Sequence, residues 1–426
     1  VDNPYKDLAV CMSVFSKEIC PTNLPHKCHI TSASLVLILF IGSFLAVSMA
    51  FSTAYSTRIT NISTSINGEV LIPAQVKSFI LDQIVNKSKA AIVIGFVDPN
   101  GTRIFSFGNM STANNIPVNQ STFFDIGSIT KTFTTLLLAD MVKQGLVNLT
   151  DPIEKYLPSG VRVPQFNEQK ITLEDLATHT SGLPEFPSDA LDNNGEIKSD
   201  YSVAQLYQAL SNTTLTRAPG SQFEYSSFGS GLLGHILSLK SGGISYEQLV
   251  KDGILDVLGM NDTKIDLSQN EINDRFPVGH IGGKEIVIPP IADVLAGAGA
   301  FRSTAADLLK YVSANLGLIH TKLDDAMQLQ HLIRHPVWIV DPVNYTKYVA
   351  LGWIIVTDFG EEAVLHTGAR TGWNAFAGFI PTKQMGIVAL CNCDHTDADM
   401  GKIGLVLLHL EGTENLTSES MKYFSK

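Results

Sequence analysis

The spacing of apolar and polar residues predicts the first elements of the main domain. Residues 75–87 place apolar side chains at helical intervals, which predicts an amphipathic helix. Residues 90–98 and 102–108 are rich in β-branched and aromatic residues, and the turn sequence Pro-Asn-Gly separates them. We therefore expect a helix followed by a β-hairpin.

From Asp151 to about Pro290 the pattern changes to short helices and loops rich in proline and glycine. In ITLEDLATHTSGLP, Thr172 is a capping candidate with Asp175 three residues later, and Gly and Pro follow the helix. Residues 303–317 predict another helix. We expect a mostly helical subdomain at about residues 151–290.

The C-terminal part returns to strand-like segments and closes with a helix at residues 403–412. The expected strands are residues 348–356, 363–369, 373–381 and 385–394. Because strands lie at both ends of the domain and helices lie between them, we expect one sheet assembled from both ends. The expected fold class is α/β (α+β) with a helical insertion.

Residues 30–57 contain no Asp, Glu, Lys or Arg, and the run SLVLILFIGSFLAVSMAF is close to the length that spans a bilayer. Three lysines precede it and only Arg58 follows directly, so the positive-inside tendency places the N-terminus in the cytoplasm. Ser48 and Ala50 have signal-peptidase spacing, which leaves a cleaved signal sequence as the alternative.

We expect a cytoplasmic tail at residues 1–29, a transmembrane segment or signal anchor at 30–57 and a stalk at 58–69. The main domain follows at residues 70–412 and a C-terminal tail at 413–426. Ten N-x-S/T sequons all follow the apolar segment, which supports export. They are Asn61, Asn86, Asn100, Asn109, Asn119, Asn148, Asn212, Asn261, Asn344 and Asn415. We expect a main domain outside the cytoplasm, anchored to the membrane, or secreted if the segment is cleaved.

Charge and cysteine content exclude two classes. The formal net charge is -11 and the chain has no run of Lys or Arg, so a nucleic-acid partner is not expected. Three of the five cysteines precede the apolar segment or flank it, and only Cys391 and Cys393 lie in the main domain. This distribution implies no disulfide framework.

Residues 123–145, FFDIGSITKTFTTLLLADMVKQG, place Ser128 and Lys131 three positions apart where a helical pattern begins. The two side chains therefore lie on the same helix face. A Ser hydroxyl needs a base to become a nucleophile, and burial or neighbouring cations lower the pKa of a Lys enough for that role. A capped helix with a solvated Lys is the structural alternative, but this is the only S-x-x-K in the chain and apolar residues flank it.

Two further segments carry candidate chemistry. In FEYSSFGSGLLGHIL, Tyr225 and Ser227 precede an apolar helix, and a phenol near an ammonium ionises more easily and relays protons. In LHTGARTGWNAF, His366, Thr367 and Gly368 lie on a strand where the Gly would let substrate lie close to the backbone. Alone, each segment is also consistent with an ordinary buried Tyr or strand His.

In this order, the segments resemble the serine β-lactamase and penicillin-binding protein superfamily, for which S-x-x-K is a signature. The likeness is to its class C-like branch of β-lactamases, D-alanyl-D-alanine carboxypeptidases and family VIII esterases, and it covers residues 70–412. Supporting stretches are LEDLATHTSGLP, LGMNDT and AGAGAFRSTAADLLKY. The resemblance implies a central antiparallel sheet flanked by helices, and a small-molecule or peptide substrate.

The resemblance also implies roles for individual residues. Ser128 would be the acylated nucleophile, Lys131 the base or its partner, and Tyr225 the relay that protonates the leaving group. Ser227 would orient the substrate. The backbone N–H groups of Ser128 and Ala369 would form the oxyanion hole.

Two departures from the family pattern affect the expected substrate. Tyr225-Ser226-Ser227 stands where many members have Tyr-x-Asn, and His366-Thr367-Gly368 where many have Lys-Thr-Gly. A His is mostly neutral at pH 7, so β-lactams and D-Ala termini should bind less well, although Arg370 could restore a cation. We therefore expect an esterase, amidase or peptidase.

Other functions stay open at this point. A carboxypeptidase or β-lactamase is the nearest alternative, and a non-catalytic binding module on the same fold is another. Cys391, Cys393, Asp394 and His395 are dense in potential metal ligands, but small buried residues are the simpler interpretation. We expect neither a cofactor nor a metal.

Overall fold

The computed structural model describes residue 72 and residues 74–409, apart from residues 114, 194, 333–334, 342–344 and 359–360. They all belong to one compact unit, Ser65–Lys426. The expected cytoplasmic tail, apolar segment, stalk and C-terminal tail lie outside the described residues. Among the described helices, none has both the length and the apolar character needed to cross a membrane.

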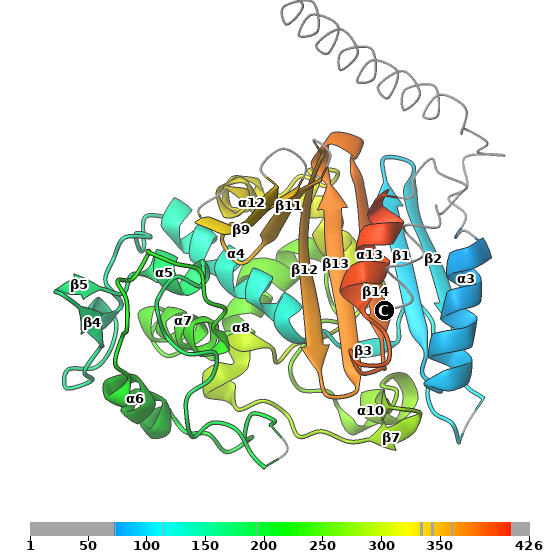
Figure 1. The fold of residues 1–426 in the computed structure, drawn as a ribbon, viewed down its shortest axis with the longest axis horizontal. Helices are drawn as coiled ribbons and strands as arrows, with labels where there is room; N and C mark the ends of the chain where they lie inside the picture. Colours follow the sequence, from blue (N-terminus) through cyan, green and yellow to red (C-terminus); the bar gives the residue numbers. More distant parts are fainter. Residues whose placement is uncertain are drawn as a thin grey trace, which may run out of the picture. The chain divides into compact units, whose positions relative to one another are not determined.

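One eight-stranded sheet forms the centre of this unit (Figure 1). Its strand order is β2-β1-β14-β13-β12-β11-β10-β9, and all neighbouring strands are antiparallel. The strands are β1 (Ile92–Asp98), β2 (Gly101–Phe107), β9 (His335–Asp341), β10 (Tyr345–Val349), β11 (Ile354–Asp358), β12 (Glu361–Arg370), β13 (Trp373–Ile380) and β14 (Met385–Cys391). Because β1 pairs with β14, the sheet joins both ends of the domain, and this prediction is confirmed.

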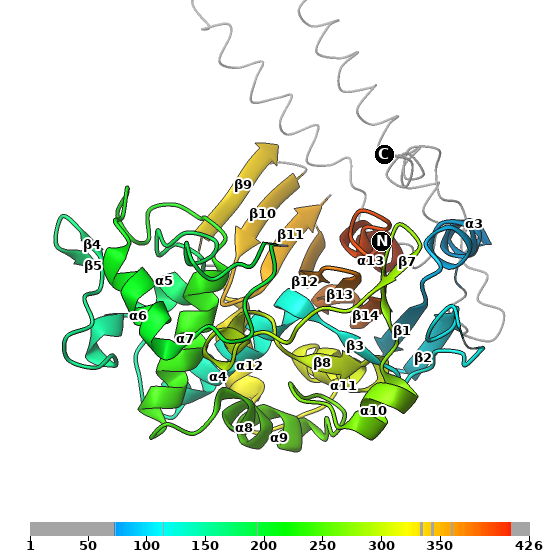
Figure 2. The ribbon, with the colours of Figure 1, turned by 90° about the horizontal axis from the view of Figure 1, so that it is seen from below.

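Helices cover both faces of the sheet (Figure 2). One face carries α3 (Ala74–Phe79), its π-helical continuation η1 (Ile80–Lys87) and α13 (Met400–His409). The other carries α4 (Thr130–Lys143), α11 (Ala305–Asn315) and α12 (Asp324–His331). Strand β1 supplies residues to both cores in turn, which explains why its sequence is apolar almost throughout.

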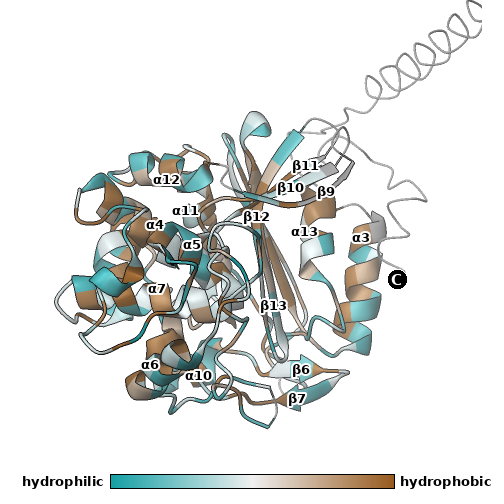
Figure 3. Cartoon of the chain, turned by 60° about the vertical axis from the view of Figure 1, so that its left-hand side comes forward, coloured by the Kyte–Doolittle hydropathy of each residue, from teal (hydrophilic) through white to brown (hydrophobic). Residues whose placement is uncertain are grey.

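The expected helical region at residues 151–290 contains α5 (Leu173–Ala177), α6 (Val203–Asn212), α7 (Ser227–Lys240), α8 (Tyr246–Val250), η4 (Lys251–Leu255), α9 (Asp256–Leu258) and α10 (Gln269–Arg275). In Figure 1, α5, α6 and α7 lie to the left of the sheet, whereas α10 lies below β14. Thr172 and Asp175 form the expected capping box at α5. Helix α6 shows both hydrophobic and hydrophilic colouring, as expected for a helix with one face in water (Figure 3).

Smaller elements complete the unit. Short strands pair as β3 (Phe123–Asp125) with β8 (Arg302–Thr304), β4 (Gln165–Phe166) with β5 (Gln169–Lys170), and β6 (Gly279–Ile281) with β7 (Lys284–Ile286). Short 3-10 helices are η2 (Gly127–Ile129), η3 (Ile153–Lys155), η5 (Asp293–Ala298) and η6 (Pro381–Lys383). Strand β3 and the turn η2 lead directly into α4, and β8 leads into α11.

The expectation of one strand at residues 348–356 is wrong. The chain turns between β10 and β11, and Gly352 takes a left-handed φ of +72° there. A Cβ atom at this position would lie 2.3 Å from Thr135 Oγ1 of α4, so only glycine fits the turn. The apolar residues on both sides of the turn predict one continuous strand, and the sequence pattern does not indicate β9.

Candidate active site

The Ser128 turn connects β3 to α4. Ser128 lies in the 3-10 turn η2, not in the first α-helical turn as the pattern predicts, and Lys131 lies at the start of α4. Lys131 Nζ is 2.9 Å from Ser128 Oγ. The structure thus brings the two side chains into hydrogen-bond contact, as their spacing predicts.

Burial gives Lys131 the properties of a base. Its side chain is 1% exposed, and Nζ also donates a hydrogen bond to the carbonyl oxygen of Ala298 at 2.5 Å. Desolvation lowers the pKa of Lys131 to about 7, although the carboxylate of Glu185 acts in the opposite direction. A large fraction of Lys131 is therefore neutral at pH 7 and can accept the Ser128 proton.

Tyr225 lies against the same pair from the loop before α7. Lys131 Nζ is 5.0 Å from the centre of the Tyr225 ring, and Tyr225 hydrogen-bonds with Ser128. Burial raises the pKa of Tyr225 despite this hydrogen bond, so the expectation that the neighbouring amine eases its ionisation is wrong. Tyr225 is a phenol at neutral pH and can donate a proton.

His179 is a buried neighbour of this group that the sequence analysis missed. Its ring centre lies 4.5 Å from that of Tyr225, and its Nδ1 accepts a hydrogen bond from Ser226 N at 3.1 Å. Burial, followed by the charges of Lys131 and His366, holds the pKa of His179 well below its usual range. A neutral His179 therefore supports the Tyr225 loop without adding charge.

The end of β12 approaches the Ser128 turn through its backbone. A Cβ atom on Gly368 would lie 1.9 Å from the carbonyl oxygen of Ile126, so this contact requires glycine. A Cβ on Gly127 would lie 2.9 Å from both N and O of Ala369. Strand β11 pairs with β12 only as far as Leu365, so the edge beside Ala369 is free of a strand partner among the described residues.

His366 and Thr367 lie on opposite faces of β12. His366 is buried near Lys131, its Nδ1 lies 2.6 Å from Thr367 O, and burial lowers its pKa to about 4. Thr367 is exposed on the opposite face, where a Cβ on Gly401 of α13 would contact its Cγ2 at 3.0 Å. Neither residue lines the cavity beside Ser128, so their substrate-orienting roles stay predictions.

Arg370 holds the site together and does not replace a free cation. Its Nη1 lies 2.9 Å from Asp125 Oδ2, and its Nη2 lies 3.2 Å from Glu196 Oε2 and 2.8 Å from Pro289 O. Asp125 also accepts a hydrogen bond from Gly127 N. This buried network ties β3, β12 and the Glu196 loop to the Ser128 turn.

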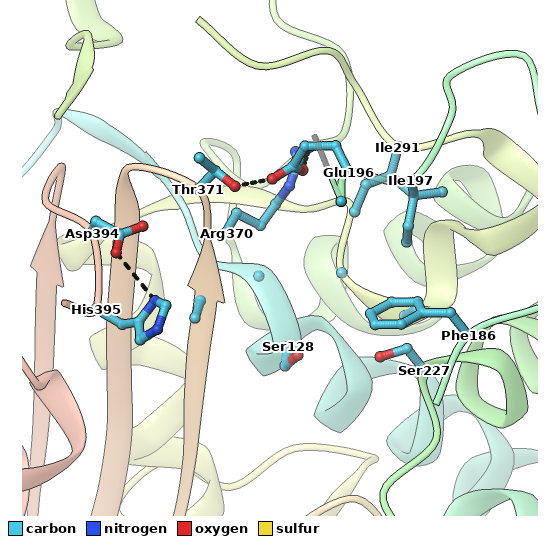
Figure 4. Close-up of a pocket in the computed structure, with 15 residues that line it drawn as sticks. Ser128, Phe186, Glu196, Ile197, Ser227, Ile291, Arg370, Thr371, Asp394 and His395 are labelled. Carbon is cyan, nitrogen blue, oxygen red and sulfur yellow. Dashed lines mark hydrogen bonds and ion pairs between the residues drawn. The ribbon is translucent and has the colours of Figure 1, made fainter. Parts of the chain in front are cut away.

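A cavity of about 250 Å³ opens beside Ser128 (Figure 4). Ser227, the first residue of α7, lines it with its hydroxyl turned toward Ser128. Ala369 also lines it. The cavity therefore joins the nucleophile, one expected orienting hydroxyl and the strand edge of β12.

Comparison with known proteins identifies the family of this fold and site. The Beta-lactamase family matches residues 81–410, which is most of the chain. The chain belongs to the Beta-lactamase family. It is a serine hydrolase, and the family, fold class and enzyme class that the motifs predict are confirmed.

Relatives and solved structures agree with this assignment. The D-alanyl-D-alanine-carboxypeptidase/endopeptidase AmpH of Escherichia coli K12 is 31% identical over 301 residues, which cover 68% of this chain and 76% of that protein. A beta-lactamase of the same organism is 30% identical over 320 residues, covering 68% and 80%.

Two solved structures share the fold. A class C beta-lactamase superposes with a TM-score of 0.67 at 23% identity and covers 83% of this chain and all of its own. An octameric penicillin-binding protein homologue from Pyrococcus abyssi has a TM-score of 0.67 at 25% identity, with coverages of 79% and 76%.

Within this family fold, Cys391 and Cys393 form a disulfide at the end of β14. The sequence analysis implied no disulfide framework, and a pair two residues apart gave no signal for one. Because each sulfur is bonded to the other, neither is a thiolate ligand for a metal. Asp394 and His395 line the cavity, and His395 Nδ1 lies 3.3 Å from Asp394 Oδ1.

Proposed function

We propose that this Beta-lactamase family member hydrolyses ester or amide bonds through an acyl-enzyme on Ser128. The observation that carries the proposal is the 2.9 Å contact between Ser128 Oγ and a Lys131 whose pKa lies at about 7. A buried neutral amine in this position removes the hydroxyl proton as Oγ attacks the substrate carbonyl carbon.

Each proton of the acylation step has a place in this geometry. Lys131 takes the Ser128 proton, and the N–H groups of Ser128 and Ala369 stabilise the oxyanion, each contributing about 3 kcal/mol. Tyr225 donates its phenolic proton to the leaving alcohol or amine and recovers one from Lys131. In deacylation, water gives a proton to the same relay, attacks the acyl carbon and releases Ser128 with its hydroxyl restored.

A burst assay tests the acyl-enzyme. The protein carrying residues 70–412 should release a stoichiometric burst of p-nitrophenol from a p-nitrophenyl ester and label at Ser128 with a fluorophosphonate. Ser128→Ala should abolish both. Equal turnover by Ser128→Ala and the unchanged protein would contradict the proposal.

A second candidate is carboxypeptidase or β-lactamase activity, which the printed names of the relatives favour. The neutral His366 argues against it, because it stands in place of the Lys of Lys-Thr-Gly and Arg370, on the same strand, is paired with carboxylates. Nitrocefin turnover comparable to ester turnover would select this candidate.

We also propose that the main domain lies outside the cytoplasm and that residues 30–57 anchor it to the membrane. In support, the seven acceptor asparagines among the described residues are all exposed: Asn86, Asn100, Asn109, Asn119, Asn148, Asn212 and Asn261. Expression in a glycosylating cell should give a membrane-bound protein whose mass falls after glycosidase treatment. A soluble, unglycosylated product would contradict this proposal.

A further inference from the structure

The cavity beside Ser128 has two chemically different halves (Figure 4). Phe186, Ile197 and Ile291 form an apolar half next to Ser227. Glu196, Arg370, Asp394 and His395 form the other half, which carries charged and titratable groups. Ser128 lies between the two, so a substrate that reaches it contacts both halves.

The cation of the charged half is fully engaged by acidic groups. The Arg370 side chain is 5% exposed and pairs with both Asp125 and Glu196. Glu196 also accepts a hydrogen bond from Thr371 Oγ1. A substrate carboxylate would have to compete with two carboxylates of the protein for this guanidinium.

Acidic groups outnumber basic ones around Ser128, even when the partly protonated Lys131 is counted with Arg370. Glu196 and Asp394 outnumber Arg370 in the cavity wall, and Asp125 lies directly behind it. The exposed Glu185 directly precedes Phe186 of the cavity wall and acts electrostatically on Lys131 and Tyr225. Charge of one sign in a cleft concentrates ligands of the opposite sign.

A second cavity of about 350 Å³ extends this negative region. It shares Ile291 with the first cavity and is lined by Asp200, Asp266 and Asp293, with no Lys or Arg among its lining residues. Beside Glu185, the Phe186 ring offers an apolar face of the kind that binds ammonium groups. The walls of both cavities therefore carry more carboxylates than Lys and Arg side chains.

We propose that the active site selects ester or amide substrates that carry a positively charged ammonium group, with Glu185 and Glu196 as specificity-determining residues. This inference rests on the proposed acyl-enzyme function. It goes beyond it because it names the charge that distinguishes a good substrate from a poor one.

Matched substrates test the proposal. Thioesters of one size would carry a trimethylammonium group, its neutral tert-butyl isostere or a carboxylate, either on the acyl part or on the leaving thiol. In at least one series, kcat/KM at low salt should be about tenfold higher for the cation than for the neutral isostere, and lowest for the anion. Added salt should shrink the difference.

Variants locate the charges responsible. Glu185→Gln and Glu196→Gln should each lower the ratio of kcat/KM for the cationic and neutral thioesters by about threefold or more. Glu168→Gln, an exposed carboxylate outside the cavity wall, is the matched control and should leave the ratio unchanged. Glu185 has an exposed side chain, so its variant should fold even if Glu196→Gln is destabilised.

Two failures are distinguishable in this experiment. A neutral or anionic substrate preferred in both series, with Ser128 still labelled by a fluorophosphonate, would overturn the charge selection alone. No hydrolysis of any thioester, together with no labelling of Ser128, would overturn the acyl-enzyme function itself. Ratios that neither Glu variant changes would remove Glu185 and Glu196 as the determinants.

Discussion

Lys131 and Arg370 are two buried basic side chains beside the same Ser128 turn, but their surroundings are opposite. Lys131 contacts a hydroxyl and a carbonyl oxygen, and the carboxylate that influences it, Glu185, is exposed. Arg370 pairs directly with the carboxylates of Asp125 and Glu196. Burial therefore lowers the pKa of Lys131, whereas Arg370 lies within an ion-pair network.

Because of this difference, Lys131 is suited to act as a base and Arg370 to hold the site in place. A lysine without a buried counter-ion costs folding stability but provides a base near neutral pH. An arginine between two carboxylates provides no base and instead fixes the positions of three chain segments. Substitutions at Lys131, Arg370 and Glu185 therefore test the two surroundings separately.

Lys131→Met should have the largest effect, with opposite signs for activity and stability. Loss of the base should lower kcat/KM for a p-nitrophenyl ester by about 10³-fold or more. The shift of the Lys131 pKa from 10.5 to about 7 corresponds to roughly 4 kcal/mol of stability lost at pH 7, so the variant should have a higher Tm.

The pH dependence of that gain has a defined sign. Between about pH 7 and 10.5 the unfolded chain binds the lysine proton and the folded chain does not, so stability rises with pH in this window. The Tm advantage of Lys131→Met should therefore shrink as the pH rises. Lys240→Met, at an exposed lysine, is the control, and an equal Tm change there would contradict the explanation.

Arg370→Ala should lower stability by about 3–5 kcal/mol, because it leaves Asp125 and Glu196 without their buried counter-ion. Thermal denaturation measures this loss. Arg370→Lys should recover only part of it, since an ammonium cannot reproduce both pairs and the contact with Pro289 O. A Tm unchanged by Arg370→Ala would mean that the network does not support the site.

Glu185→Gln should have the smallest effect, a small shift of the pKa of Lys131 in the pH profile of kcat/KM. The Glu185 carboxylate raises the pKa of Lys131 against the effect of burial. Its removal should move the rising limb of the kcat/KM profile to lower pH, by less than about one unit because Glu185 is exposed. A shift to higher pH would contradict the assigned sign.

The sequence predicted those parts of the molecule that depend on local spacing. The contact of Ser128 with Lys131, the hairpin β1–β2 and the capping box of α5 all involve residues close together in the chain. The sheet built from both ends of the domain also followed from the pattern, because the sequence places strands at both ends and helices between them.

Features that depend on tertiary contact could not be read from the chain. His179 packs on Tyr225, and Arg370 reaches Asp125 across 245 positions of sequence. The turn at Gly352 requires glycine because Thr135 of α4 occupies the space beside it. For the same reason, burial reversed the expected effect on Tyr225, since residue type alone does not show which neighbour or how much solvent surrounds a phenol.

The pH dependence of kcat/KM for a neutral p-nitrophenyl ester, measured from pH 5 to 10, tests the account most directly. If buried Lys131 is the base that activates Ser128, activity should rise along a single limb with an apparent pKa of about 7, and Lys131→Met should lose that limb. A limb with an apparent pKa near 10, as for a solvated lysine, would contradict the assignment of Lys131 as the base. The same limb in Lys131→Met would contradict it as well.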